Sequence, residues 1–229
     1  LLDAERKPLF VYRQAAAPGP SSELKVPRDG AKLSDAQKKE ILAYSGSAAA
    51  SPEAAKIAGL KKKIAALITV YRPGSHADVL VGKYLQGFPT DEAFNDPRVE
   101  IVSFYIDQMF EDDMSRDLSE RFGIPIYPSI VGALTLGGKQ LAVDGVLLIG
   151  EHGDYAWNEK EQHLYPRRHF MEQITGVMAT SGRGVPIYND KHLSWRWEDA
   201  KWMADRAVEL GAPFMAGSSL PVCWRDPFL

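Results

Sequence analysis

The chain has 229 residues, of which 45% are hydrophobic and 25% charged, and a formal net charge of −3; this is typical of a soluble globular protein with one sizeable or two small domains. The small net charge gives no reason to expect nucleic acid or an anionic membrane as a partner, and no run of about 18 apolar residues is present to span a membrane. The single cysteine, Cys223, excludes an internal disulfide bond and a multi-cysteine metal site but does not fix the compartment.

Residues 1–62 differ in composition from the rest of the chain. They are rich in Ala, Pro, Gly and Ser, which is typical of linkers and extended arms, with one short helix predicted after Ser34. The chain also begins with Leu-Leu-Asp, from which we expect a processed or trimmed product. We therefore predict an N-terminal arm at 1–62 that leans on a main domain at 63–229, and we assign no chemistry to the arm.

The stretch 63–87 predicts a strand, a tight turn and a helix. The short apolar run at 64–70 contains β-branched residues and indicates a buried strand. In the R-P-G-S-H-A-D turn that follows, Ser75 and Asp78 have the spacing of a helix N-terminal cap. Apolar residues then recur at helical spacing up to Leu85. This is the opening unit of a doubly wound α/β domain, whose ligands bind beyond the carboxyl ends of the strands.

Strand and helix patterns alternate through the rest of the chain. Further strands are predicted at 99–106, 124–127, 145–149, 185–188 and 213–216, with helical patterns between them. The helix near Pro166 begins with Arg167 and Arg168, which could hold a carboxylate or phosphate bidentately but are expected to be solvated. Six strands joined by right-handed helical crossovers predict an α/β fold with a doubly wound parallel sheet, Rossmann-like, of order 3-2-1-4-5-6.

Polar residues follow most of these predicted strands. If the strands are parallel, their carboxyl ends lie along one edge of the sheet, where α/β proteins bind small molecules. We therefore expect a small-molecule site there, built from these residues: His76, Asp107, Glu151, His152, Asp154, Asp190, Lys191, His192, Ser218, Ser219.

Two sequence motifs carry a resemblance to a known family. The motifs are G-I-P-x-Y-P-S-I-x-x-A-L at 123–134 and D-G-V-L-L-I-G-E-H at 144–152, and an acid-Lys pair follows the fifth strand. With these features, residues 63–225 resemble the nucleotide-binding half of the Gfo/Idh/MocA oxidoreductases. The resemblance implies NAD or NADP as cofactor and hydroxyl carbons of sugars or inositols as substrates. In that family a lysine of an E-K-P segment lies at the reacting carbon, and the matching Asp190-Lys191-His192 makes Lys191 the catalytic candidate.

The resemblance also implies where a cofactor would bind: on the first turn, at Asp107 as the ribose-binding acid, and at Glu151. The residues of the turn are Tyr71, Gly74, Ser75 and His76. The G-x-G-x-x-G fingerprint is altered, because Thr69 and Tyr71 stand at its first two glycines. We expect Tyr71 to fill the space for phosphate and Asp78 to add negative charge at the helix start.

A second departure is that the family's second domain has no counterpart after the sixth strand. We expect the chain to be a fragment, to be completed by a partner, or to use its sheet in another way.

Several residue assignments have a structural alternative. Asp107 either binds ribose or caps a helix, and Lys191 either polarises a carbonyl and exchanges a proton or is an exposed loop lysine. His152 and His192 are either acid–base groups near neutral pH or neutral, hydrogen-bonded loop residues. His76 is expected to orient the turn.

Three functions therefore follow from the sequence. The first is hydride transfer between a nicotinamide and a carbinol carbon, in which Lys191 or a nearby histidine, His192 or His152, transfers the hydroxyl proton. For this function we expect a small-molecule substrate and a homo-oligomer or a partner subunit. The second is a metal-dependent hydrolase or lyase using His152, Asp154 and His192. The third is a non-catalytic scaffold or subunit that uses its sheet edge or a tryptophan-bearing surface as an interface.

Overall fold

The structure is a computed structural model that describes residues 61–89 and 94–217. The predicted arm lies outside this range apart from its last two residues, and so do Ser218, Ser219 and Cys223. The chain divides into two compact units, one containing residues 86–96 and the other containing 60–85 and 97–229. In the first unit, β2 (Phe88–Pro89) and β3 (Phe94–Asn95) pair antiparallel. The second unit holds the main sheet, and the description below concerns that unit.

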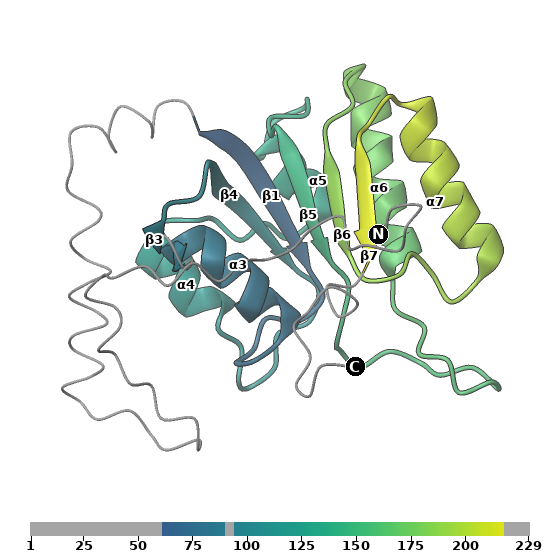
Figure 1. The fold of residues 1–229 in the computed structure, drawn as a ribbon, viewed down its shortest axis with the longest axis horizontal. Helices are drawn as coiled ribbons and strands as arrows, with labels where there is room; N and C mark the ends of the chain where they lie inside the picture. Colours follow the sequence, from purple (N-terminus) through teal and green to yellow (C-terminus); the bar gives the residue numbers. More distant parts are fainter. Residues whose placement is uncertain (1–60, 90–93, 218–229) are drawn as a thin grey trace, which may run out of the picture. The chain divides into compact units, whose positions relative to one another are not determined.

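The main sheet confirms the predicted Rossmann-like α/β fold. Its strands are β1 (Lys62–Ile68), β4 (Val99–Ile106), β5 (Gly145–Ile149), β6 (Ile187–Asp190) and β7 (Phe214–Gly217). They lie in the order β4-β1-β5-β6-β7, and every pairing is parallel (Figure 1). This is the predicted order without its third strand.

The third predicted strand, at 124–127, is reduced to a single parallel bridge between Ile126 and Phe104 beside β4. The N–H of Phe104 donates to the backbone oxygen of Pro125 at 2.9 Å, and the N–H of Tyr127 donates to that of Phe104 at 2.8 Å. Pro125 has no N–H, so the ladder cannot extend to the residues before this contact, and after it Ser129 already caps α5. The segment still occupies the outer position expected for the third strand.

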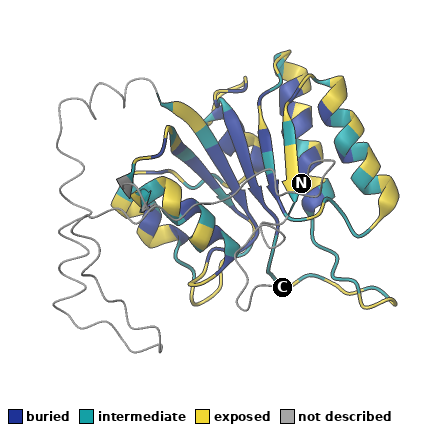
Figure 2. Cartoon of the chain, viewed as in Figure 1, coloured by how far each residue is buried: buried dark blue, intermediate teal, exposed yellow. Residues whose placement is uncertain are grey.

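The central part of the sheet is buried on both faces, where the strands are dark blue in Figure 2, whereas β7 is partly exposed. Along β1, Ala65 and Leu67 belong to one hydrophobic cluster, whereas Ala66 and Ile68 belong to another. This alternation follows from the period of two along a strand. Each buried Leu or Ile side chain contributes about 1.5–3 kcal/mol to stability. A strand buried on both faces is expected to have a continuous apolar sequence, as residues 145–149 in β5 do.

In the described part of the chain, five helices cover the two faces. The helices α3 (His76–Gln86) and α4 (Ser115–Phe122) contribute to one cluster, and α5 (Ile130–Thr135), α6 (Arg167–Ser181) and α7 (Trp197–Glu209) to the other. Within the described residues, no helix is long and apolar enough to cross a bilayer.

The helix ends follow the sequence signals. The side chain of Ser129 accepts from the N–H of Gly132 at 3.0 Å and caps α5 as predicted. Gly123 and Gly182 end α4 and α6 in the left-handed conformation, with φ of 68° and 60°. These caps set where each helix begins or ends, and therefore where the chain turns between a helix and the next strand.

Candidate functional site

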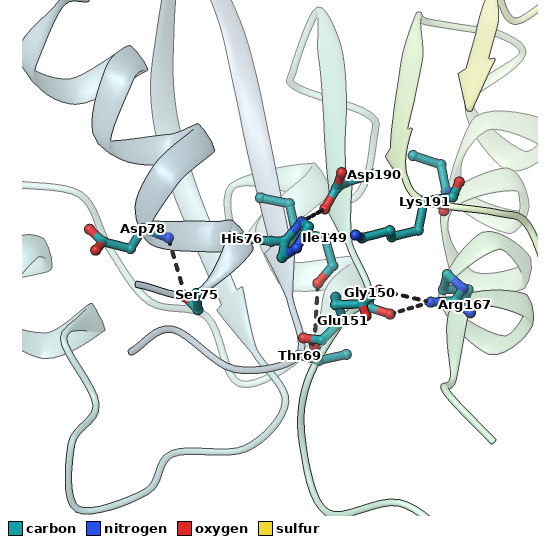
Figure 3. A network of polar contacts seen from close by, with 11 residues as sticks. Thr69, Ser75, His76, Asp78, Ile149, Gly150, Glu151, Arg167, Asp190 and Lys191 are labelled. Atoms are coloured by element: carbon teal, nitrogen blue, oxygen red, sulfur yellow. Dashed lines mark hydrogen bonds and ion pairs between the residues drawn. The ribbon is translucent and has the colours of Figure 1, made fainter. Parts of the chain in front are cut away.

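The carboxyl ends of β1 and β5 are joined by hydrogen bonds at the edge where a site was predicted. Thr69 follows β1, and its Oγ1 donates to the backbone oxygen of Glu151, which follows β5, at 2.5 Å. The N–H of Thr69 donates to the backbone oxygen of Ile149 at 3.1 Å. Figure 3 shows side chains from β6, α3 and α6 around this junction. The expected convergence of loops at this edge is confirmed.

His76 and Asp190 form a close side-chain contact at this edge. His76 begins α3 and Asp190 ends β6, and Nδ1 of the imidazole lies 2.7 Å from Oδ2 of the carboxylate (Figure 3). The side chain of Asp190 is 4% exposed and that of His76 is 34% exposed. A buried carboxylate on Nδ1 keeps a proton on that nitrogen and leaves Nε2 to exchange protons. This pair joins residues 114 positions apart, and the sequence did not predict it.

His152 lies beside this pair, with its ring centroid 5.6 Å from that of His76. Its φ of 65° is left-handed, and its Nε2 is buried without a hydrogen-bond partner among the described residues. Burial lowers the pKa of His152, Glu151 opposes this effect, and the positive charges of Arg72 and Lys191 lower the pKa further. His152 is therefore neutral at pH 7.

Lys191 follows Asp190 and adopts an unusual backbone conformation, with φ of 103°. Its N–H donates to the backbone oxygen of Gly217 at 3.1 Å, and its own oxygen accepts from Nδ2 of Asn189 at 2.8 Å. Figure 3 shows the side chain extending from the end of β6 toward the place where His76 and Asp190 meet. Backbone strain of this kind is found most often at functional sites.

The prediction that Arg167 is solvated is wrong for this arginine. It begins α6 but is 1% exposed rather than solvated. Its Nη1 donates to the backbone oxygen of Gly150 at 2.7 Å and lies 3.7 Å from Oε2 of Glu151, and its guanidinium lies 5.0 Å from the ring centroid of Tyr165. A run of two arginines at a helix start does not reveal burial, because the contacts come from residues far along the chain.

His192 contacts the same guanidinium. Nη2 of Arg167 lies 2.9 Å from Nε2 of His192. Arginine has only donors, so Nε2 must be the acceptor and the ring carries its proton on Nδ1. Burial lowers the pKa of His192, and the charge of Arg167 lowers it further. Of the two roles left open for His192, the contacts favour a neutral, hydrogen-bonded loop histidine.

The turn between β1 and α3 is closed by its own side chains. Oγ of Ser75 accepts from the N–H groups of Arg72 and Asp78, each at 3.3 Å, which agrees with the predicted cap. Oδ2 of Asp78 accepts from the N–H of Gly74 at 2.9 Å, and Pro73 has no N–H. Tyr71 is 0% exposed and packs edge-on against Phe104, so its side chain lies in the core rather than over the turn.

Asp107 lies directly after β4, where a ribose-binding acid was predicted. The hydroxyl of Tyr105 donates to its Oδ1 and that of Tyr155 to its Oδ2, each at 2.6 Å. Burial, followed by the hydrogen bond to Asp107, raises the pKa of both phenols, so both remain protonated donors. Tyr155 comes from the loop after β5 and was not predicted to contact this acid.

The metal-site hypothesis finds no support in this geometry. Among the residues that the structure describes, no three His, Cys, Asp or Glu side chains are grouped so that they could share a metal ion. The N–H of Asp154 donates to Oε1 of Gln108 at 2.7 Å, and Nε2 of Gln108 donates to the backbone oxygen of Asp154 at 3.1 Å. His192 is engaged by Arg167 instead.

A dinucleotide in the usual Rossmann pose fits this edge only in part. Asp107 has the position and the acceptors for ribose hydroxyls, although two tyrosines already donate to it. The turn does not fit a pyrophosphate, because the N–H groups of Arg72 and Gly74 have internal partners and Asp78 adds a negative charge beside them.

Comparisons with known proteins give limited similarity. No protein-family model and no curated protein matches the chain. Biliverdin reductase from Synechocystis sp. PCC 6803, solved with biliverdin and NADP+, is 18% identical over 67% of this chain and 37% of its own, with a TM-score of 0.39.

Two further solved structures match to a similar extent. GenD2 from gentamicin A biosynthesis, solved with NAD, is 20% identical over 69% of this chain and 34% of its own, with a TM-score of 0.42. UDP-N-acetylglucosamine 3-dehydrogenase GnnA from Acidithiobacillus ferrooxidans is 13% identical over 69% and 38%, with a TM-score of 0.42. The matched part thus spans little more than a third of each of these chains, and similarity of this extent establishes neither a family nor an activity.

Proposed function

We propose that this chain is the Rossmann-like domain of an oxidoreductase that acts on a hydroxyl-bearing carbon of a sugar- or polyol-like compound. The observation that supports the proposal is the 2.7 Å contact between His76 and the buried carboxylate of Asp190. Oxidation of a carbinol requires a base for the hydroxyl proton. A histidine held by a carboxylate beyond the strand ends supplies such a base.

In this proposal Asp190 orients His76 and stabilises the imidazolium that forms when Nε2 takes the proton. The partial exposure of His76 leaves the ring accessible to a substrate. In the reverse direction the same nitrogen returns the proton to the carbonyl oxygen. His76 is therefore proposed as the catalytic acid–base residue, in place of His192.

Lys191 is proposed to stabilise the negative charge that develops on the substrate oxygen. Its side chain extends toward His76 and Asp190, so an oxygen bound there would lie near both an ammonium and an imidazole (Figure 3). His152, neutral and with an unpartnered Nε2, is proposed to hydrogen-bond the same ligand.

The hydride acceptor in this proposal is NAD or NADP, which supplies two-electron chemistry that side chains lack. Asp107 would hold its ribose hydroxyls. At the turn after β1 the N–H of Gly74 is already bound to the carboxylate of Asp78, so we derive no step through the dinucleotide.

The test uses the whole chain with NAD+ or NADP+ and a panel of sugars, polyols and inositols, following the absorbance of the reduced nicotinamide. We expect turnover of at least one compound, and a loss of about 10²–10⁴ in kcat for His76→Gln, the size of an acid–base contribution. His169→Gln, at an exposed position of α6, is the matched control and should leave the rate unchanged. Equal turnover by His76→Gln and the parent would contradict the assignment of His76.

A second candidate is a non-catalytic scaffold or subunit, and the internally closed turn and the occupied Asp107 favour it. Trp157 and Trp197 are 63% and 75% exposed and offer apolar surface for another chain or a second copy. Absence of nicotinamide binding and turnover, together with a concentration-dependent oligomer in light scattering, would favour this function.

A further inference from the structure

We infer that Asp78 and Tyr155 control whether a dinucleotide binds at this edge of the sheet, because their side chains make the hydrogen bonds that the cofactor's phosphate and ribose groups would otherwise make. The inference rests on the proposed function, since it concerns the cofactor of the same site. It is carried by three sets of contacts at the carboxyl ends of β1, β4 and β5.

The first contact lies at the turn after β1. In a Rossmann fold an anionic pyrophosphate accepts hydrogen bonds from the N–H groups of this turn and of the helix start. Here the anion is the carboxylate of Asp78, which accepts from the N–H of Gly74 at 2.9 Å. The carboxylate therefore replaces both the charge and an acceptor of a phosphate, and a phosphate must displace it to bind.

The second contact lies at the end of β4. An acid in this position normally accepts hydrogen bonds from ribose hydroxyls. In this protein two phenolic hydroxyls take that role, one on each carboxylate oxygen of Asp107 and both at 2.6 Å. The pair Tyr105 and Tyr155 thus reproduces the two donors of a ribose diol.

The third set of contacts holds Tyr155 in place. The strand order is β4-β1-β5, so a segment that runs from the end of β5 to the end of β4 must cross the end of β1. The segment 151–155 does so: the backbone of Glu151 accepts from Thr69 after β1, and the backbone of Asp154 pairs with Gln108 after β4. A dinucleotide bound in the usual pose lies across this same crevice.

Gly153 makes this path possible. Its φ is 120°, and a Cβ there would lie 2.4 Å from Cε2 of Tyr155 and 3.0 Å from Oε1 of Gln108. A side chain at this position would push both residues away. Gly153→Ala therefore disturbs the same contacts as Tyr155→Phe by an independent route.

The test is a titration of the whole chain with NADH and NADPH, followed by nicotinamide fluorescence. We expect weak binding by the parent. We expect a gain of about tenfold or more for Asp78→Ala with Tyr155→Phe, because the double variant removes two internal hydrogen bonds that a dinucleotide would have to displace. Asp78→Asn keeps an acceptor but removes the charge, and so separates the two effects. Gly153→Ala should also gain affinity.

Matched controls are Asp117→Asn, in the first turn of α4, and Tyr84→Phe, on α3; both should bind as the parent does. Thermal unfolding of each variant confirms that it is folded. If the parent already binds as tightly as the double variant, the inference is overturned and the proposed function survives. If no variant binds either nucleotide, the inference is overturned and the cofactor of the proposed function is overturned with it.

Discussion

Arg167 lies so close to Gly150 that a side chain at position 150 would have to displace it. Nη1 of the guanidinium donates to the backbone oxygen of Gly150 at 2.7 Å, and a Cβ on this glycine would lie 2.4 Å from Cγ of Arg167. The absence of a side chain at the end of β5 thus allows a fully buried guanidinium to lie beneath the candidate site, where it also contacts Glu151 and His192.

Gly150→Ala is expected to destabilise the protein by about 1–3 kcal/mol, because the new methyl group overpacks the site and displaces Arg167. Urea unfolding followed by circular dichroism measures the change. Gly176→Ala is the control: this glycine is inside α6, and an added Cβ has nothing within 4 Å, so stability should stay equal or rise by up to about 1 kcal/mol. Equal effects of the two substitutions would show that the contact with Arg167 is unimportant.

Arg167→Gln is expected to raise the pKa of His192, since the guanidinium lies 2.9 Å from Nε2 and its charge disfavours the imidazolium. Burial, the larger cause of the lowered pKa, remains, so the rise should be partial. The NMR titration of the His192 ring protons measures it. An unchanged titration would mean that the ring does not accept a hydrogen bond from Arg167.

Stability should fall as the pH drops below about 6.5, the ordinary pKa of histidine. The pKa values of His152 and His192 are both lowered in the folded protein, chiefly by burial. The unfolded chain therefore binds more protons in this range, and the free energy of unfolding rises with pH. The stabilising contribution is complete above the unfolded pKa and is lost as the pH falls toward the folded values.

The measurement is urea unfolding at a series of pH values from neutral to mildly acidic. His152→Asn with His192→Asn should flatten the dependence, whereas His169→Asn, exposed on α6, should leave it as it is. A parent curve that is flat between neutral and mildly acidic pH would contradict the neutral state of the two rings.

Lys191→Gly is expected to stabilise the fold by about 1 kcal/mol or more while removing activity. A non-glycine residue at φ of 103° carries backbone strain of about 1–3 kcal/mol, which glycine does not. Lys201→Gly is the matched control and should have the opposite sign, because it places glycine inside α7, at a cost of about 1 kcal/mol. Thermal unfolding compares the two. A loss of stability in both variants would show that Lys191 is not strained.

The fold was largely predictable because its signals are local. The apolar run before the turn, the Ser75 cap and the glycines that end α4 and α6 each act within a few residues, and the order of the parallel strands then follows from right-handed crossovers. The third predicted strand is reduced to one bridge for an equally local reason, since Pro125 lacks a donor that its ladder would need and Ser129 already caps α5.

The site was predictable only as an edge of the sheet. From the sequence we predicted that His76, Asp107, His152 and Lys191 follow strand ends. Which residues they contact was not predictable, because these contacts join positions that are far apart in the chain. Asp190 lies 114 residues from His76, and Tyr155 reaches Asp107 from a loop with no periodic pattern. The burial of Arg167 likewise depends on a glycine 17 residues earlier. No spacing rule reveals such contacts before the sheet has assembled.

The central claim is that Asp190 holds His76 in the protonation state that accepts the substrate proton. The most direct measurement is kcat of Asp190→Asn for the best compound of the polyol and sugar panel, beside Asp205→Asn, which alters an exposed carboxylate of α7. We expect Asp190→Asn to lower kcat by about 10²–10⁴, because an amide at this position favours the wrong imidazole tautomer, and Asp205→Asn to leave it unchanged. Full turnover by a folded Asp190→Asn variant would contradict the account.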